Sequence, residues 1–318
     1  AEDSIIEQWL QEQNKEKLAK AWVNGAQIDW KLMYSKEDHV YKIKLPTYPF
    51  LKERYWIEEQ GSAKEEVSIN RLHILIDKNN SSFKEQRYIK NLKGTEFYLD
   101  DHIINRKKVL PGVIHIEMAR AACELAMEKR VCRMKNIVWS RPVLVEKAKQ
   151  VEIALSMKEY GISYEIRSME DGQSHMHSQG IAEFDNPSEI DDEVFDLEAC
   201  KKVCCRYISH QEFYESSNHS IYNYGITFQP VQEIFLGEQE VLSKIEVPKV
   251  RLDEFEKFTL HPSLLEGCLQ TVVGLMSRNS SEAFMPFAIE EIEILHPLTK
   301  SGYVYAAYAD NNTEARKN

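Results

Sequence analysis

The sequence lacks any apolar run near the about 18 residues that a membrane-spanning helix needs, and its acidic start, Ala1 to Ser4, is unlike a secretory signal. It also lacks the GxSxG, GxxxxGK[ST] and GxGxxG patterns of nucleophile elbows, phosphate-binding loops and dinucleotide sites. We therefore expect a cytoplasmic protein, with no membrane partner, that uses none of these three chemistries.

Positive charge is scarce as well. The chain has 40 Lys+Arg against 51 Asp+Glu, which leaves a formal charge of −11. A nucleic-acid binder needs a basic surface for phosphate, so we expect no nucleic-acid partner. With 318 residues, 43% of them hydrophobic, the length predicts about two domains with real cores.

Cysteine is sparse, and its six residues form no CxxC pair. Cys200, Cys204 and Cys205 are close in sequence but lack the paired spacing of structural zinc, so we interpret them as thiols. His175 and His177 would share one face of a strand, without a third ligand. We expect no metal site.

The first 66 residues differ in pattern from the rest. Apolar spacing predicts a helix over residues 4–24, ended by Asn24-Gly25, and the aromatic segment that follows is kept irregular by Pro46 to Phe50. Residues 58–68 are polar and charged, as in a linker. We therefore predict an N-terminal helix plus an extended linker over residues 1–66, packed against another domain.

From residue 69 onward, short alternating segments predict antiparallel strands at 87–92, 96–99, 150–157, 163–168 and 180–184. Two longer segments, 111–130 and 262–277, begin with proline and are apolar nearly all round, which predicts buried helices. The expected fold class is α+β, with two long central helices each wrapped by a curved antiparallel sheet. The halves would be residues 67–190 and 191–318.

Two positions in these halves could carry acid–base chemistry. His102 lies nine residues before Pro111-Gly112. The N-terminus of a helix that begins there would stabilise a substrate oxygen on which negative charge develops. Glu266 and Gln270 lie four apart on one face of the second helix, and the leucines around Glu266 would keep its carboxyl protonated. A neutral base with a protonated acid can remove a proton from one carbon and help hydroxide leave the next.

Each signal also has an ordinary interpretation. A histidine at a strand end is usually structural, a glutamate on an apolar helix usually reaches solvent or a lysine, and His115 is expected to be a core histidine. The combination is what favours a catalytic site.

The motifs resemble those of polyketide synthase dehydratase domains. The run His102-x-x-x-Arg106-x-x-x-x-Pro111 is similar to HxxxGxxxxP, residues 221–228 are similar to GYxYGPxF, and residues 260–270 are similar to LHPxLLDxxxQ. The resemblance covers about residues 69–318 and implies a double hot-dog fold, in agreement with the two-helix pattern.

The resemblance implies a syn elimination of water from a 3-hydroxyacyl thioester. His102 would take the α-proton and Glu266 would protonate the departing hydroxyl, giving an α,β-unsaturated thioester. The N–H of Gly112, which follows Pro111 at the helix start, would bind the thioester carbonyl. Tyr224 and Gln270 would position Glu266 or the hydroxyl.

The same resemblance implies partners but no cofactor in the chain. The substrate would arrive on the phosphopantetheine arm of an acyl carrier protein, and a homodimer is expected. Residues 1–60, with Trp22-x-x-Gly25 and residues 45–50 and 54–56, resemble the linker that follows ketosynthase or acyltransferase domains and would contact a preceding ketosynthase. This organisation suits a synthase whose acyltransferase acts in trans.

Two residues depart from the family pattern. Glu266 replaces the usual aspartate. Arg106, the first of three consecutive basic residues, replaces the motif glycine. These basic residues either form a solvent-exposed turn or bind the acyl carrier protein. These changes leave open a catalytically silent structural module. They also leave open a double-bond-shifting isomerase or a cyclase that forms oxygen heterocycles, although the retained acid and Pro111 favour dehydration.

Overall fold

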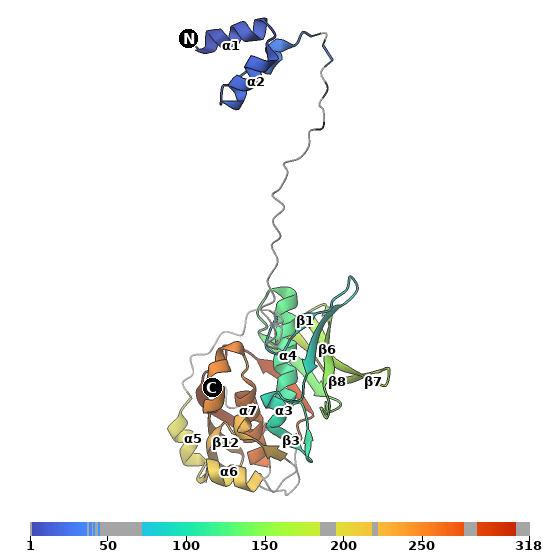
Figure 1. Ribbon diagram of the computed structural model, residues 1–318. Coiled ribbons are helices and arrows are strands. Elements are labelled where there is room, and N and C mark those ends of the chain that lie inside the picture. Colours follow the sequence, from blue (N-terminus) through green and yellow to red (C-terminus); the bar gives the residue numbers. More distant parts are fainter. Residues whose placement is uncertain are drawn as a thin grey trace, which may run out of the picture. The chain divides into compact units, whose positions relative to one another are not determined.

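The computed structural model describes residues 2–36, 38–39, 41, 44, 72–184, 195–217, 222–276 and 285–309. The chain separates into two compact units, Ala1–Lys64 and Glu65–Asn318 (Figure 1). The predicted proline-rich segment at 46–50, the linker at 58–68 and the predicted boundary between the halves at 190–191 lie outside the described residues. In the described residues, no helix is both long and apolar enough to cross a membrane.

The first unit contains two helices where the sequence predicted one. Helix α1 (Glu2–Gln11) and helix α2 (Lys15–Val23) are separated because Gln13 takes a positive φ of 53° and Asn14 caps α2 by accepting a hydrogen bond from the Lys17 N–H at 3.3 Å. A 3₁₀ turn, η1 (Trp30–Met33), follows α2. Leu10, Leu18 and Met33 form the small core of this unit.

The second unit begins with an antiparallel sheet of seven strands in the order β1-β2-β6-β7-β8-β5-β13. Its strands are β1 (Lys78–Asn79), β2 (Gln86–Leu92), β5 (Arg133–Trp139), β6 (Lys149–Lys158), β7 (Gly161–Glu170), β8 (Gln173–Glu183) and β13 (Ala288–Glu293). Four of the five predicted strand segments lie in this sheet. The fifth prediction, a strand at 96–99, was wrong: residues Phe97–Asp100 form the short helix α3, and in the turn before it the Glu96 carboxylate accepts the N–H groups of Lys93 and Gly94.

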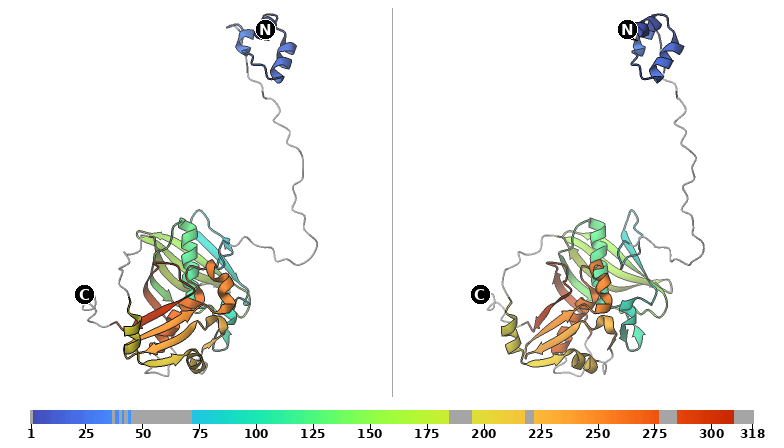
Figure 2. Two further views of the ribbon diagram at one scale, coloured as in Figure 1. Left: turned by 90° about the vertical axis from the view of Figure 1, so that its left-hand side faces the viewer. Right: turned by 60° about the vertical axis from the view of Figure 1, so that its left-hand side comes forward.

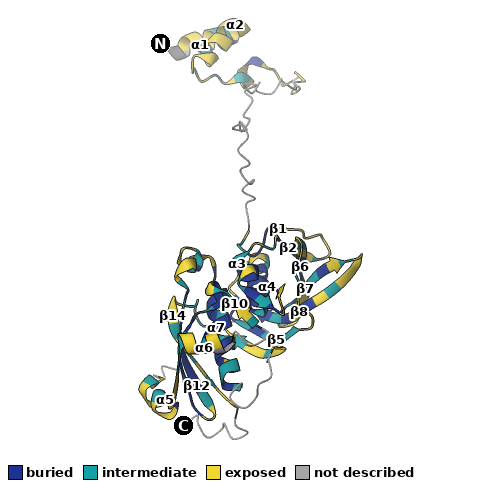
Figure 3. Ribbon diagram, turned by 60° about the horizontal axis from the view of Figure 1, so that its bottom comes forward, coloured by how far each residue is buried: buried dark blue, intermediate teal, exposed yellow. Residues whose placement is uncertain are grey.

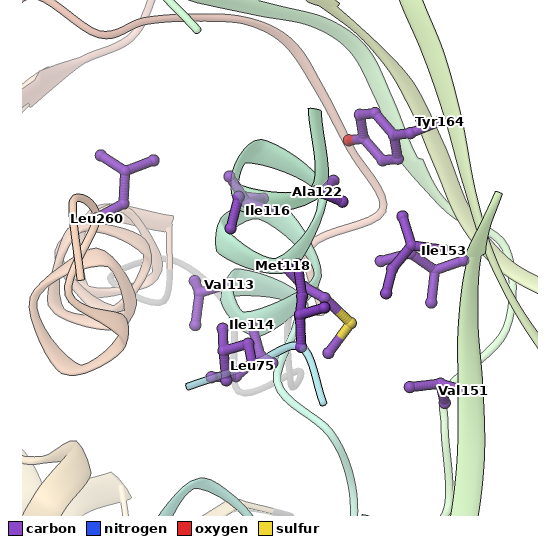
Figure 4. Close-up of a cluster of buried hydrophobic side chains, with 14 of the residues drawn as sticks. Leu75, Val113, Ile114, Ile116, Met118, Ala122, Val151, Ile153, Tyr164 and Leu260 are labelled. Atoms are coloured by element: carbon purple, nitrogen blue, oxygen red, sulfur yellow. The ribbon is translucent and has the colours of Figure 1, made fainter. Parts of the chain in front are cut away.

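Helix α4 (Gly112–Met127) packs on this sheet through strands β6, β7 and β8. The helix is buried on every side over its first three turns, as its nearly uniform apolar sequence predicts (Figure 3). Met118 and Ala122 face Ile153 and Tyr164 of the sheet, whereas Val113 and Ile116 face the side of Leu260 (Figure 4).

The second half repeats this plan around helix α7 (Pro262–Met276), which packs on strands of a four-stranded antiparallel sheet in the order β14-β12-β11-β9. The strands are β9 (Arg206–Ser209), β11 (Val231–Leu236), β12 (Glu240–Glu246) and β14 (Ser301–Ala307). Further elements are α5 (Leu197–Val203), α6 (His210–Ser217), η2 (Ile226–Phe228) and η3 (Lys249–Lys257). Two central helices, each against a curved antiparallel sheet, confirm the predicted double hot-dog fold.

The two halves contact each other through both helices and strands. Helices α4 and α7 lie side by side (Figure 2), and β13 of the second half completes the edge of the first sheet by pairing with β5. A third sheet of three short strands, β10 (Tyr222–Tyr224), β3 (His102–Ile104) and β4 (Lys107–Lys108), again combines strands of both halves.

A buried carboxylate also joins the halves. Glu117 on α4 is fully buried and binds the guanidinium of Arg120 with two hydrogen bonds, at 2.6 and 2.8 Å. Its oxygens also accept the backbone N–H groups of Thr259 and Leu260 at 3.0 and 3.2 Å, just before α7. Burial raises the pKa of the Glu117 carboxyl, while the Arg120 pairing and the two backbone donors oppose that rise. This carboxylate therefore fixes the start of α7 against the middle of α4.

Candidate active site

His102 is the first residue of β3 and is 5% exposed. Its Nδ1 lies 2.8 Å from the carbonyl oxygen of Val109. Because a carbonyl only accepts, Nδ1 carries the hydrogen and Nε2 is left with a lone pair. Burial lowers the pKa of His102 to about 4, against the weaker opposing effect of the Val109 bond. The ring is therefore held neutral, with Nε2 able to act as a base.

The helix that follows begins one residue later than predicted, with Pro111 at the N-cap and Gly112 as its first residue. The Ile114 N–H returns to the carbonyl of Pro111 at 3.0 Å, and the first N–H groups of a helix have no partner within it. The Trp139 indole packs against Gly112 and donates its Nε1–H to the Gly112 carbonyl at 3.2 Å. A Cβ on Gly112 would lie 2.8 Å from Trp139 Cε2, so this helix start accepts only glycine without rearrangement.

Glu266 lies in the second turn of α7 and is 7% exposed. Burial raises the pKa of its carboxyl to about 7, and the hydrogen bond from Tyr224 opposes the rise. Tyr224 donates its hydroxyl to Glu266 Oε1 at 3.3 Å. Near neutral pH, Glu266 can thus hold a proton that it can give away.

Tyr224 connects the acid to the base. Strand β10 pairs antiparallel with β3 so that Tyr224 lies directly opposite His102, and their ring centroids are 5.9 Å apart. Tyr222 stacks on Tyr224, with centroids at 5.6 Å and planes 4° apart. His102, Tyr224 and Glu266, which come from distant parts of the sequence, therefore form one continuous group.

Gln270 lies one turn after Glu266 and is buried. Its amide nitrogen donates to the carbonyl of Phe228 at 3.0 Å, and its amide oxygen accepts the hydroxyl of Tyr214 at 2.7 Å. Gln270 thus holds the segment after Tyr224, and its predicted contact with Glu266 or with substrate stays a prediction. Tyr214, on α6, also accepts the Val231 N–H at 3.1 Å, a connection that sequence reasoning did not find.

The basic triplet begins in the tight turn between β3 and β4, which Asn105 and Arg106 form, and continues as Lys107 and Lys108 of β4. Asn105 and Arg106 both have positive φ, 48° and 63°, the conformation for which glycine is preferred. Lys107 pairs with Glu146 at 3.1 Å and Lys108 pairs with Asp100 at 2.5 Å. Among the described residues, Arg106 is exposed and forms no ion pair.

The remaining candidates make packing or hydrogen-bond contacts within the fold. Cys200 and Cys204 are buried beside Leu242, and His177 Nε2 lies 2.8 Å from Ser168 Oγ. His115 is a buried residue of α4 whose Nδ1 lies 2.8 Å from Ser178 Oγ. Within the described ranges, no three His, Cys, Asp or Glu side chains come together as metal ligands.

Family models match both halves of the second unit. Residues 73–169 match the polyketide synthase dehydratase domain, and residues 192–318 match the model described as the polyketide synthase dehydratase N-terminal domain. Polyketide synthase PksN of Bacillus subtilis is 35% identical over 98% of this chain, and PksM of the same organism is 32% identical over 94%. The chain spans only 6% and 7% of these relatives' lengths.

Solved structures give the same result for the fold. A dehydratase domain of a trans-acyltransferase polyketide synthase from Brevibacillus brevis is 35% identical, with a TM-score of 0.72 over 76% of this chain and 88% of that chain. The dehydratase domain from the CurF module of curacin polyketide synthase, 19% identical, shares the fold with a TM-score of 0.69 over 76% of this chain and 89% of that chain. With these matches and the His102–Tyr224–Glu266 group in one site, the chain belongs to the polyketide synthase dehydratase family.

Proposed function

We propose that the protein is a hydro-lyase that removes water from a 3-hydroxyacyl thioester carried by an acyl carrier protein. The observation that carries this proposal is the pairing of a neutral base with a protonated acid. Burial lowers the pKa of His102 to about 4 and raises that of Glu266 to about 7, so between these values each group is in the form that elimination requires.

The proposed reaction balances with these two residues alone. His102 Nε2 takes the proton from the α-carbon, and the electrons of that C–H bond form the new double bond. The C–O bond at the β-carbon breaks while Glu266 gives its proton to the departing oxygen, so that water leaves. The N–H of Gly112, at the positive end of α4, would bind the thioester oxygen as negative charge develops there. His102 then releases its proton to solvent and Glu266 takes one up from solvent, which resets both groups.

Tyr224 supports the acid in this scheme. Its hydroxyl stabilises the Glu266 carboxylate that remains after proton donation, because a hydrogen bond to the charged form is stronger than one to the neutral form. The extra methylene of Glu266, compared with aspartate, still leaves its carboxyl within reach of Tyr224. This intact site favours a dehydratase over a silent structural module, and the retained carboxylic acid favours it over the isomerase and the cyclase.

We also propose the partners that the sequence predicted. The carrier protein would bring its phosphopantetheine arm to the site, and among the three consecutive basic residues 106–108 only Arg106 is free of an ion pair in the described chain. Residues 1–60 would contact a preceding ketosynthase, the second unit would form a homodimer, and the reaction would take place in the cytoplasm with no cofactor in the chain.

The proposal is tested by incubating the protein with a panel of 3-hydroxyacyl carrier proteins of both configurations and reading the intact mass. Loss of one water is expected. His102→Ala should remove activity, Glu266→Gln should nearly remove it, and Glu266→Asp should retain or improve it. His296→Ala, a change at an exposed histidine, is the matched control. An unchanged mass across the panel, or wild-type rates in His102→Ala, would refute the proposal.

A further inference from the structure

Asp101, the residue immediately before His102, joins the base to a distant part of the chain. Its Oδ2 accepts two hydrogen bonds from Thr227, one from the backbone N–H at 2.9 Å and one from Oγ1 at 2.6 Å. Its own carbonyl oxygen accepts the Gly225 N–H at 2.9 Å. One residue of the first half therefore makes three hydrogen bonds to the turn that follows Tyr224.

Gly225 fits this contact because it has no side chain. A Cβ at this position would lie 2.1 Å from Asp101 Oδ1 and 2.2 Å from its Cγ. Gly225 has a φ of −71°, so its need for glycine comes from close packing and not from an unusual backbone angle. The carboxylate of Asp101 occupies the space that any larger residue would need.

The segment held by Asp101 carries the groups that surround the base. Tyr224 lies opposite His102 in the β3–β10 pair, and Phe228 has its ring centroid 5.8 Å from that of His102. The β10–β3 ladder joins only three residue pairs, and a short ladder alone fixes register weakly. Hydrogen bonds to a carboxylate are among the stronger ones, and here they lie directly next to the ladder.

We infer that Asp101 is a positioning residue of the dehydratase site, which holds Tyr224, and through it Glu266, at the correct distance from His102. This inference rests on the proposed function, because it assigns a role within that reaction. Asp101 acts through Thr227 and Gly225 and donates no proton itself. Its removal leaves His102 and Glu266 in the chain but loosens the segment that sets their separation.

The test compares Asp101→Ala and Thr227→Val with the matched control Asp100→Ala. Asp100 lies one residue earlier and pairs with Lys108 at a half-exposed surface, so its loss removes a carboxylate and an ion pair but leaves the Thr227 bonds intact. In Asp101→Ala we expect kcat to fall by about 10- to 100-fold, with KM changed by less than about threefold, since small misplacements of catalytic groups slow the chemical step. Asp100→Ala should keep wild-type kcat.

A second measurement separates positioning from a general loss of stability. The Tyr224 hydrogen bond lowers the pKa of Glu266, so a displaced Tyr224 should raise it. Titration of the Glu266 carboxyl by ¹³C NMR, assigned with Glu266→Gln, should show a rise in Asp101→Ala in the same direction as in Tyr224→Phe. A role only in folding would lower the melting temperature without moving this titration.

The outcomes are distinct. Wild-type kcat and an unmoved Glu266 titration in a folded Asp101→Ala protein would overturn the inference. If Asp101→Ala does not fold, the test is the comparison of Thr227→Val with Thr227→Ser. Serine keeps the hydroxyl that donates to Asp101, so Thr227→Ser should keep the wild-type kcat and the wild-type Glu266 titration, whereas Thr227→Val should change both. If the wild-type protein dehydrates no substrate, the proposed function fails, and the titration still shows whether Asp101 fixes the Tyr224–Glu266 contact.

Discussion

Replacement of Glu266 by glutamine should make the protein more stable at alkaline pH while removing its activity. The carboxyl is buried in α7, and its pKa is raised from 4.5 to about 7. Each unit of pKa shift between the folded and unfolded states is worth about 1.4 kcal/mol, so ionising this group in the folded protein costs about 3 kcal/mol. Glutamine has nearly the same shape and never ionises.

The sign follows from proton binding. Between about pH 4.5 and pH 7 the folded state keeps the Glu266 proton while the unfolded state has lost it. The stabilisation from this group is therefore complete below about pH 4.5, declines as the pH rises, and is gone above about pH 7. Glu266→Gln should match wild type near pH 4.5 and exceed it by about 3 kcal/mol at pH 8, or by about 6–12 °C in melting temperature.

The assay is urea unfolding of both proteins at several pH values between 4.5 and 8.5. Because the variant is compared with wild type at each pH, the contributions of all other titrating groups cancel to first order. Glu246→Gln, on the partly exposed strand β12, is the control and should change stability by less than about 0.5 kcal/mol at every pH. A difference between Glu266→Gln and wild type that does not grow with pH would show that the carboxyl is not held protonated by burial.

Three further predictions follow from the same structure. Arg106→Gly should raise stability by about 1 kcal/mol, because Arg106 has a φ of 63°, and calorimetry that shows no increase would contradict the strain at this turn. Glu117→Ala should lower the free energy of unfolding by about 2–4 kcal/mol, because it leaves two backbone N–H groups without their acceptor and removes one of the two carboxylates that pair with buried Arg120, the other being Glu124; a loss under about 1 kcal/mol in urea unfolding would mean that water replaces the carboxylate. The pH profile of kcat/KM should be a bell with limbs near pH 4, where His102 becomes protonated, and pH 7, where Glu266 loses its proton, and activity that keeps rising to pH 9 would exclude Glu266 as the acid.

Much of the fold was predictable because its strongest signals are local. The apolar sequences of α4 and α7 and the prolines before or at their starts predict two buried helices whatever surrounds them. His102, Gly112 and Glu266 could be named as candidates because each has a fixed spacing from one of these helices. The break at Asn14 was missed because it depends on a single cap and one positive φ, which apolar spacing does not reveal.

The residues that were missed act across long sequence separations. Trp139 reaches Gly112 from the end of β5, and Tyr214 reaches Gln270 from α6. Asp101 meets Thr227 only because β3 and β10 pair. None of these contacts follows from local spacing, since strand pairing between the halves decides which side chains meet.

The division of the site between the two halves has a consequence for synthesis of the chain. The base leaves the ribosome with β3, early in the second unit, whereas the acid follows with α7, near the end of that unit. Until β10 pairs with β3 and the carboxylate of Glu117 receives the segment before α7, His102 has neither Tyr224 nor Glu266 beside it. A growing polypeptide therefore carries the histidine before its acid, and the proposed acid–base pair can form only after α7 has been synthesised.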